Sequence, residues 1–169
     1  MKVRTDYITN SSSSSFILAF SDEKDYDKFK EYANWLEYND FANLIETVRN
    51  EYSQDEMRAN ANEFLWNYYG YKEKKQMMRE RFEGTHFENY VDRIKAENEY
   101  EDSEEFQNKL KEKIEKTEYK EKKERLDQSD IVIETTVWDT NGGLLEWAVR
   151  KGFVESEFYE WLLLQHNVG

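Results

Sequence analysis

The chain of 169 residues contains no cysteine, no proline and only six glycines. Without cysteine it forms no disulfide bond, thiolate zinc site or iron–sulfur cluster, and it has no cysteine nucleophile. Only two histidines are present, His86 and His166, and their spacing matches no metal-binding helix motif. The residues that most often build catalytic and metal centres are therefore scarce, and a reducing compartment is compatible with the composition.

Motifs for nucleotide binding, hydrolysis and membrane insertion are also missing. No glycine loop of the form GxxxxGK[ST] or GxGxxG is present, and the five serines Ser11 to Ser15 lie outside any GxSxG turn. The longest uncharged apolar runs, Phe16 to Phe20 and Trp161 to Leu164, are too short to cross a bilayer, and Met1 to Asp6 lacks the apolar stretch of a signal peptide. We expect no catalytic residue, no cofactor, no membrane partner and a cytoplasmic location.

Acidic side chains and aromatic rings are what the chain has in excess. Its 37 Asp and Glu against 24 Lys and Arg give a formal charge of −13, and 12 Tyr, 10 Phe and 5 Trp supply apolar area that the aliphatic side chains lack. A chain of this length buries about two thirds of its unfolded surface, so we expect one domain over residues 1–169. The negative charge opposes direct DNA binding, because such binding depends on lysine and arginine.

The apolar pattern predicts a mainly helical α+β fold with a small antiparallel sheet. The run Phe16 to Phe20 follows turn-forming serines and is typical of a buried strand. Residues 131–138 alternate in the manner of a second strand, and Val3 to Ile8 is a candidate third. Several helices are expected to cover this sheet.

Helical periodicity is clearest between the two predicted strands. Apolar positions from Phe41 to Tyr52 recur at three and four residues and form an amphipathic stripe. A further helix is expected to follow Ser53 and to end near Gly70, and Gly84 separates two more.

The carboxyl-terminal half is expected to contain more helices. Residues 103–126 predict a highly charged helix, a candidate projection into solvent, whose apolar contacts end near Ile114. Two short helices, Leu144 to Lys151 and Glu157 to Gln165, are expected to close the chain.

One short segment has a known counterpart. The string Asp6-Tyr7-Ile8-Thr9-Asn10, followed by Ser11 to Ser15 and Phe16-Ile17, resembles the amino-terminal signature of many small uncharacterised proteins from Firmicutes genomes and their mobile elements. The resemblance covers 12 of the 169 residues. It implies an origin and implies no activity, cofactor or site residue.

The strongest charge asymmetry lies between Glu31 and Glu63, which we call the acidic interval. It contains eight acidic residues and only two basic ones, Arg49 and Arg58. Carboxylates along helices can imitate the phosphates of a nucleic acid, and Tyr and Trp are favoured at protein interfaces. The predicted partner-binding residues are Glu31, Glu37, Asp40, Glu46, Glu51, Asp55, Glu56, Glu63, Trp35 and Tyr38.

These features favour a non-enzymatic protein that blocks a basic, nucleic-acid-binding surface of a host protein. An inhibitor from a phage or mobile element is one candidate, with a CRISPR effector as one candidate target. A solubilising acidic surface without a partner is the simpler interpretation of the same charges. A housekeeping adaptor, contacting another helix through residues 103–126, is a further alternative.

Two other sites are weaker candidates. Asp130, Glu134 and Asp139 surround the predicted second strand, where carboxylates could hold Mg²⁺ for a hydrolase or nuclease, but position 136 is threonine where a common nuclease motif has lysine. The basic island, defined as Lys72, Lys74, Lys75, Arg79 and Arg81, could contact RNA or phosphate, although such an island is more often a solvated helix face.

Overall fold

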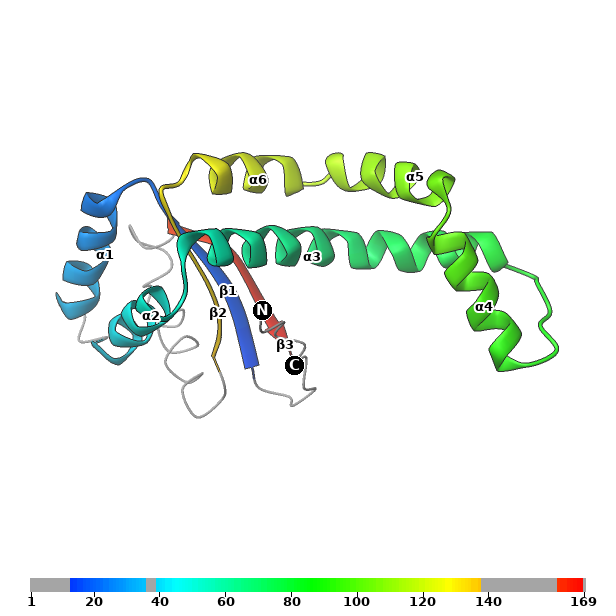
Figure 1. Cartoon of the computed structure of the whole chain (residues 1–169), viewed down its shortest axis with the longest axis horizontal. Helices are drawn as coiled ribbons and strands as arrows, with labels where there is room; N and C mark the ends of the chain where they lie inside the picture. The colour runs from blue at the N-terminus through cyan, green and yellow to red at the C-terminus, as the bar shows by residue number, and fades with distance from the viewer. Residues whose placement is uncertain (1–12, 36–38, 138–160, 169) are drawn as a thin grey trace. The chain divides into compact units, whose positions relative to one another are not determined.

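The computed structural model describes residues 13–35, 39–137 and 161–168 (Figure 1). These residues form six α-helices and a three-stranded antiparallel sheet, which confirms the mainly helical α+β class. They group into two compact units: a sheet unit, up to Ala61 and from Arg125 onward, and a helical unit, Asn62 to Glu124. The expectation of a single domain stays a prediction, and each unit is described by itself.

The sheet has the order β2-β1-β3, with β1 (Ser13–Phe20) between β2 (Ile131–Val137) and β3 (Leu162–Val168) (Figure 1). Both neighbours run antiparallel to β1. Both strands predicted from the sequence are confirmed. The continuous apolar run of β1 fits its central position, because a central strand can be buried on both faces. Every side chain from Phe16 to Phe20 is at most 2% exposed.

The third strand corrects the sequence analysis. Leu162 to Gln165 was expected in a helix and instead belongs to β3, where the pairing with β1 shifts register between Ile17 and Leu18. A short leucine run fits a buried helix or a strand equally well, and pairing with β1 decides the outcome. The candidate strand at residues 3–8 and the expected helix at residues 144–151 lie outside the described residues.

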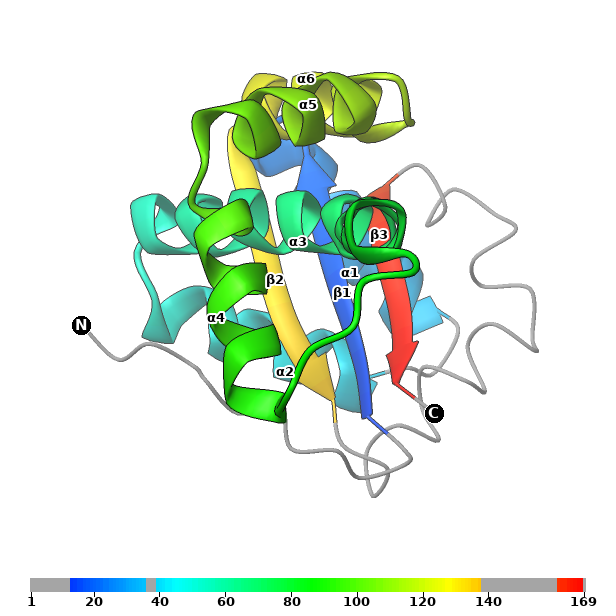
Figure 2. The ribbon, with the colours of Figure 1, turned by 90° about the vertical axis from the view of Figure 1, so that its right-hand side faces the viewer.

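Two helices, α1 (Glu23–Trp35) and α2 (Asn39–Glu51), lie on one face of the sheet (Figure 2). Of the apolar stripe that the sequence predicted, they bury Ile45 and Val48, and Leu44 and Tyr52 pack against this core partly buried. The side chains of this core alternate along the strands, as a period of two requires. The core contains Phe16, Leu18, Phe20, Ile131, Ile133, Tyr26, Phe29, Ala33, Ala42, Ile45, Val48, Met57 and Trp161.

The outer edge of β2 is covered at Val132 by one side chain. Helix α3 (Gln54–Phe82) begins with Gln54, whose Oε1 accepts a hydrogen bond from Val132 N at 2.8 Å and whose Nε2 donates to Val132 O at 3.2 Å. The amide thus replaces a fourth strand at this position. Because unpaired edge groups promote pairing with other chains, Gln54 protects the edge.

The helical unit contains most of α3 together with α4 (Tyr90–Glu101), α5 (Glu104–Glu115) and the first part of α6 (Tyr119–Gln128). Helix α5 runs beside α3 (Figure 1), and its buried positions recur every four residues. The unit's core consists of Met77, Phe106, Leu110 and Ile114, with Trp66, Tyr69, Met78, Tyr100 and Tyr119 packed against it.

Two glycines were expected near helix ends, and the structure confirms one of these expectations and corrects the other. Gly84 follows the end of α3 with φ of +74°, the left-handed conformation that ends helices, as expected. Gly70 was expected near a helix end and instead lies buried inside α3. An added Cβ there would lie 3.1 Å from Ile114 Cδ1, so the missing side chain lets α5 approach.

The helix expected over residues 103–126 is two helices, α5 and α6. The break falls at residues 116–118, where Thr117 Oγ1 donates to Ile114 O at 2.5 Å and accepts from Tyr119 N at 3.2 Å. Apolar contacts also continue beyond Ile114, because Tyr119 packs on the helical core and Leu126 is fully buried. Among the described helices, none is long and apolar enough to span a membrane.

Candidate functional site

The acidic interval is distributed over α1, α2 and the beginning of α3. Its described acidic side chains are all exposed, five of them in the sheet unit and Glu63 in the helical unit. Glu37 and Tyr38 lie outside the described residues, as do the side chains of Trp35 and Asp40. The exposed members are Glu31, Glu46, Glu51, Asp55, Glu56 and Glu63.

The first of the two arginines in this interval is used inside the fold. Arg49 donates from Nη1 and Nη2 to the Glu23 carboxylate, with Nη1 at 3.0 Å from Oε2, and its Cζ lies 4.4 Å from the centre of the Tyr26 ring. The hydrogen bonds lower the pKa of the Glu23 carboxyl and raise the pKa of the Arg49 guanidinium. Arg49 therefore neutralises an acid that lies before the interval.

The second arginine is also used inside the fold. Arg58 donates from Nη1 to Leu126 O and from Nη2 to Ser129 O, both at 2.6 Å. These carbonyls lie at the end of α6, where a helix carries partial negative charge, and a guanidinium stabilises that end. Arg58 therefore joins α3 to α6 within the sheet unit and forms no ion pair with an acid of the described residues.

Two of the exposed acids have structural roles. Glu56 forms a capping box with Ser53: its Oε2 accepts from Ser53 N at 3.0 Å, and Ser53 Oγ accepts from Glu56 N at 3.2 Å. Glu46 lies 4.0 Å from the Lys30 ammonium, which also contacts Asp27 at 3.4 Å. These two residues are weaker candidates for partner binding than the sequence suggested.

Three acids of the sheet unit remain without any such role. Within the described ranges, Glu31, Glu51 and Asp55 make no hydrogen bond through their side chains and no ion pair. Their full charge therefore faces solvent. We call these three residues the open acids.

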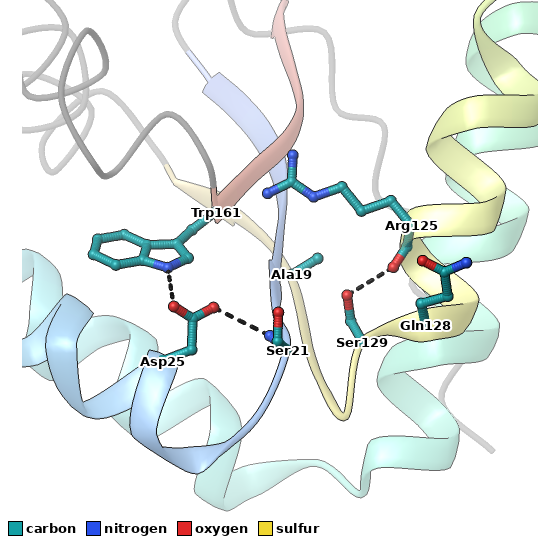
Figure 3. A pocket seen from close by; sticks show the side chains of 7 residues that line it. All are labelled: Ala19, Ser21, Asp25, Arg125, Gln128, Ser129 and Trp161. Atoms are coloured by element: carbon teal, nitrogen blue, oxygen red, sulfur yellow. Dashed lines mark hydrogen bonds between the residues drawn. The ribbon is translucent and has the colours of Figure 1, made fainter.

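The sheet unit also contains a small polar pocket of about 190 Å³ (Figure 3). Most of its groups are already satisfied by one another. Asp25 accepts from Trp161 Nε1 at 2.8 Å and from Ser21 N at 3.1 Å, while Ser129 Oγ donates to Arg125 O at 2.7 Å. The pocket is lined by Ala19, Ser21, Asp25, Arg125, Gln128, Ser129 and Trp161.

The polar groups of this pocket mainly stabilise the fold through hydrogen bonds. Asp25 fixes the indole of Trp161, which is 3% exposed and belongs to the core. Both Asp25 oxygens are occupied by donors, so the carboxylate is poorly placed to act as a base. The Arg125 guanidinium points across the pocket toward Trp161 (Figure 3).

The carboxylates considered for a metal site do not converge in the part that is described. Asp130 and Glu134 are four positions apart along the extended chain, about 13 Å, too far to share one ion. Asp139 lies outside the described residues. Among the residues with described positions, no three His, Asp or Glu side chains form a group that could hold a metal ion.

Sequence reasoning identified the exposed acids but missed the contacts that sort them. The roles of Arg49 and Arg58 depend on partners 26 to 71 positions away. The bond between Asp25 and Trp161 joins residues 136 positions apart. No local pattern signals such pairs. The capping box was readable, because Ser53 and Glu56 have the required spacing.

Comparison with known proteins adds no assignment: no protein-family model, curated protein sequence or solved structure matches the chain.

Proposed function

We propose that the protein is a non-enzymatic interaction protein whose acidic interval binds a basic, nucleic-acid-binding surface of a partner protein. The observation that carries the proposal is the use of both arginines of the interval inside the fold while the open acids Glu31, Glu51 and Asp55 stay exposed and unpaired in the described structure. Unneutralised carboxylates attract a basic surface from a distance and raise the association rate.

The formal charge is concentrated where this proposal needs it. Residues 1–61 and 125–169 together contain 20 acidic and 10 basic residues, whereas residues 62–124 contain 17 and 14. The sheet unit's sequence therefore carries most of the excess of −13. A partner that normally binds phosphates offers the complementary field, and a host nucleic-acid-binding protein such as a CRISPR effector is an example. We expect the protein to act in the cytoplasm.

Affinity capture followed by competition tests this function. The full chain is immobilised and exposed to a lysate of the cells that naturally contain it, and bound proteins are identified by mass spectrometry. The proposal expects a captured protein that binds nucleic acid, and expects that nucleic acid to displace the chain because both occupy one basic surface.

The competition has two opposing outcomes. Displacement that becomes more effective as oligonucleotide is added supports mimicry. A captured partner that binds the chain and its nucleic acid at the same time, with unchanged affinity for each, contradicts it.

A further inference from the structure

Helix α3 has a second charged face, which lies in the helical unit and differs from the acidic interval. Successive residues of an α-helix are rotated by about 100°, so residues at spacings of three and four share one side. Tyr68, Tyr71, Lys72, Lys75 and Arg79 have this spacing, and all five side chains are exposed. We call them the basic aromatic face.

The neighbours of this face show that it is turned away from the packed side of α3. Gly70 and Met77 are buried toward α5, and the Glu73 carboxylate lies 3.8 Å from the Lys113 ammonium of α5. At about 100° per residue, the basic aromatic face therefore lies on the side of α3 opposite to these three residues. Within the described chain, Tyr71 is 63% exposed.

The structure sorts the basic island into paired and unpaired members. Lys74 forms an ion pair with Glu101, and the Arg81 guanidinium lies 5.1 Å from the centre of the Tyr100 ring. Lys72, Lys75 and Arg79 have no carboxylate partner among the described residues. Three cations are thus left on the same side as an exposed ring.

Tyr71 and Lys75 are already arranged as a unit. The Lys75 ammonium lies over one face of the Tyr71 ring, 4.8 Å from its centre, so a cation and an exposed aromatic ring stand together. Proteins that bind single-stranded nucleic acid combine these two elements, because bases stack on aromatic rings while cations contact phosphates. Tyr71 to Arg79 extends about 12 Å along the helix, the length of roughly three stacked nucleotides.

We propose that the basic aromatic face of α3 binds single-stranded nucleic acid, with Tyr71 stacking on a base and Lys72, Lys75 and Arg79 contacting phosphates. An acidic peptide would satisfy the cations but would gain nothing from the exposed ring of Tyr71 beyond apolar contact. The expectation of no direct DNA binding rested on net charge, and residues 62–124 are close to charge balance, with 17 acidic and 14 basic residues. This inference is independent of the proposed function, because it concerns different residues.

Fluorescence anisotropy of a labelled twelve-nucleotide poly(U) RNA with the full chain tests the proposal. With three phosphate contacts, raising salt from about 50 to about 200 mM should weaken binding by roughly 18-fold. The face variant Lys72→Glu, Lys75→Glu and Arg79→Glu should bind at least about tenfold more weakly than the parent, and Tyr71→Ala should lose about five- to tenfold.

A matched control separates this face from a general charge effect. The variant Lys109→Glu, Lys111→Glu and Lys120→Glu makes the same change in net charge at three other exposed lysines of the helical unit. It should weaken binding by less than about threefold, since its lysines contact no phosphate. Circular dichroism confirms that each variant is folded.

Several results would overturn the proposal. One is a parent chain that fails to bind the RNA at low salt. Another is a control variant that loses as much affinity for the RNA as the face variant. A glutamate-rich peptide that binds as tightly as the RNA, with no effect of Tyr71→Ala, assigns the face to an acidic protein. Crosslinking of the parent to 4-thiouridine RNA needs no variant: adducts between residues 68 and 79 are expected, and adducts only elsewhere contradict the assignment.

Discussion

Single side chains hold the sheet unit together at points where the backbone alone would leave polar groups exposed. Gln54 pairs with both backbone groups of Val132, and Arg58 pairs with two carbonyls at the end of α6. Each residue spans more than 65 positions of sequence with two hydrogen bonds. Polar residues of a helix are normally expected to face solvent, so the sequence alone does not reveal the contacts of Gln54 and Arg58.

Gln54→Ala is expected to lower the free energy of unfolding by about 1–3 kcal/mol, because it removes two hydrogen bonds and leaves Val132 N and O unsatisfied. Urea denaturation of the variant measures the loss. Gln76→Ala is the matched control, since Gln76 is exposed and its side chain bonds, among the described residues, only Glu80 of the next helical turn. Equal stability of the two variants would show that β2 does not depend on the Gln54 amide.

Tyr26 gives a pH-dependent prediction at the same scale. Burial raises the pKa of its phenol, with opposing effects from the Arg49 guanidinium above the ring and reinforcing ones from Glu46 and Glu23. A raised folded-state pKa means that stability is fully present below the unfolded value near 10 and is lost as pH rises through the folded value. The hydroxyl also has no hydrogen-bond partner in the described structure.

Tyr26→Phe is therefore expected to keep or raise stability at pH 7, by up to about 1 kcal/mol, because it removes a buried polar atom without a partner. It should also flatten the fall in stability above pH 10. Thermal unfolding between pH 7 and pH 11 measures both effects. If Tyr26→Phe lowers stability at pH 7 by more than the parent loses between pH 7 and pH 11, the Tyr26 hydroxyl is not a buried group without a partner.

At the scale of elements, sequence patterns succeeded where the local signal and the long-range packing agree. The runs at Phe16 and Ile131 form the expected strands, and Ile45 and Val48 of the α2 stripe are buried as expected. They failed where packing decides between two local options. The leucines of β3 follow the pairing with β1, and Gly70 lies inside α3, where Ile114 packs close to its bare backbone.

The break between α5 and α6 changes which substitutions matter in residues 103–126. Leu126→Ala is expected to cost about 2–5 kcal/mol, because the side chain is fully buried. Lys120→Ala, at an exposed position of the same helix, should change stability by less than about 0.5 kcal/mol. Chemical denaturation compares them. Similar small effects at both positions would indicate that α6 makes no packed contact.

For the whole molecule, the sequence predicts where acidic residues are concentrated, but it does not predict which of them stay free of contacts inside the fold. The sequence marks the acidic interval, and each described acid is exposed. Only the structure shows that Glu46 lies near Lys30 and that both arginines are used elsewhere, whereas the Glu56 cap follows from its spacing to Ser53. Charge in a sequence records how many carboxylates exist, whereas their neutralisation depends on tertiary contacts.

The open acids therefore carry the central claim, and charge reversal tests them. The acid variant is Glu31→Lys, Glu51→Lys and Asp55→Lys. Its control, Glu99→Lys, Glu112→Lys and Glu124→Lys, makes the same change in net charge at exposed acids of the helical unit. Thermal unfolding verifies that both variants keep the fold.

The most direct measurement is the dissociation constant of each variant for the captured basic partner at low and physiological salt. The account predicts that the acid variant binds at least about tenfold more weakly than the control, and that the difference narrows as salt screens the charges over a Debye length of about 8 Å. Equal affinity of the two variants for the partner at low salt would contradict it.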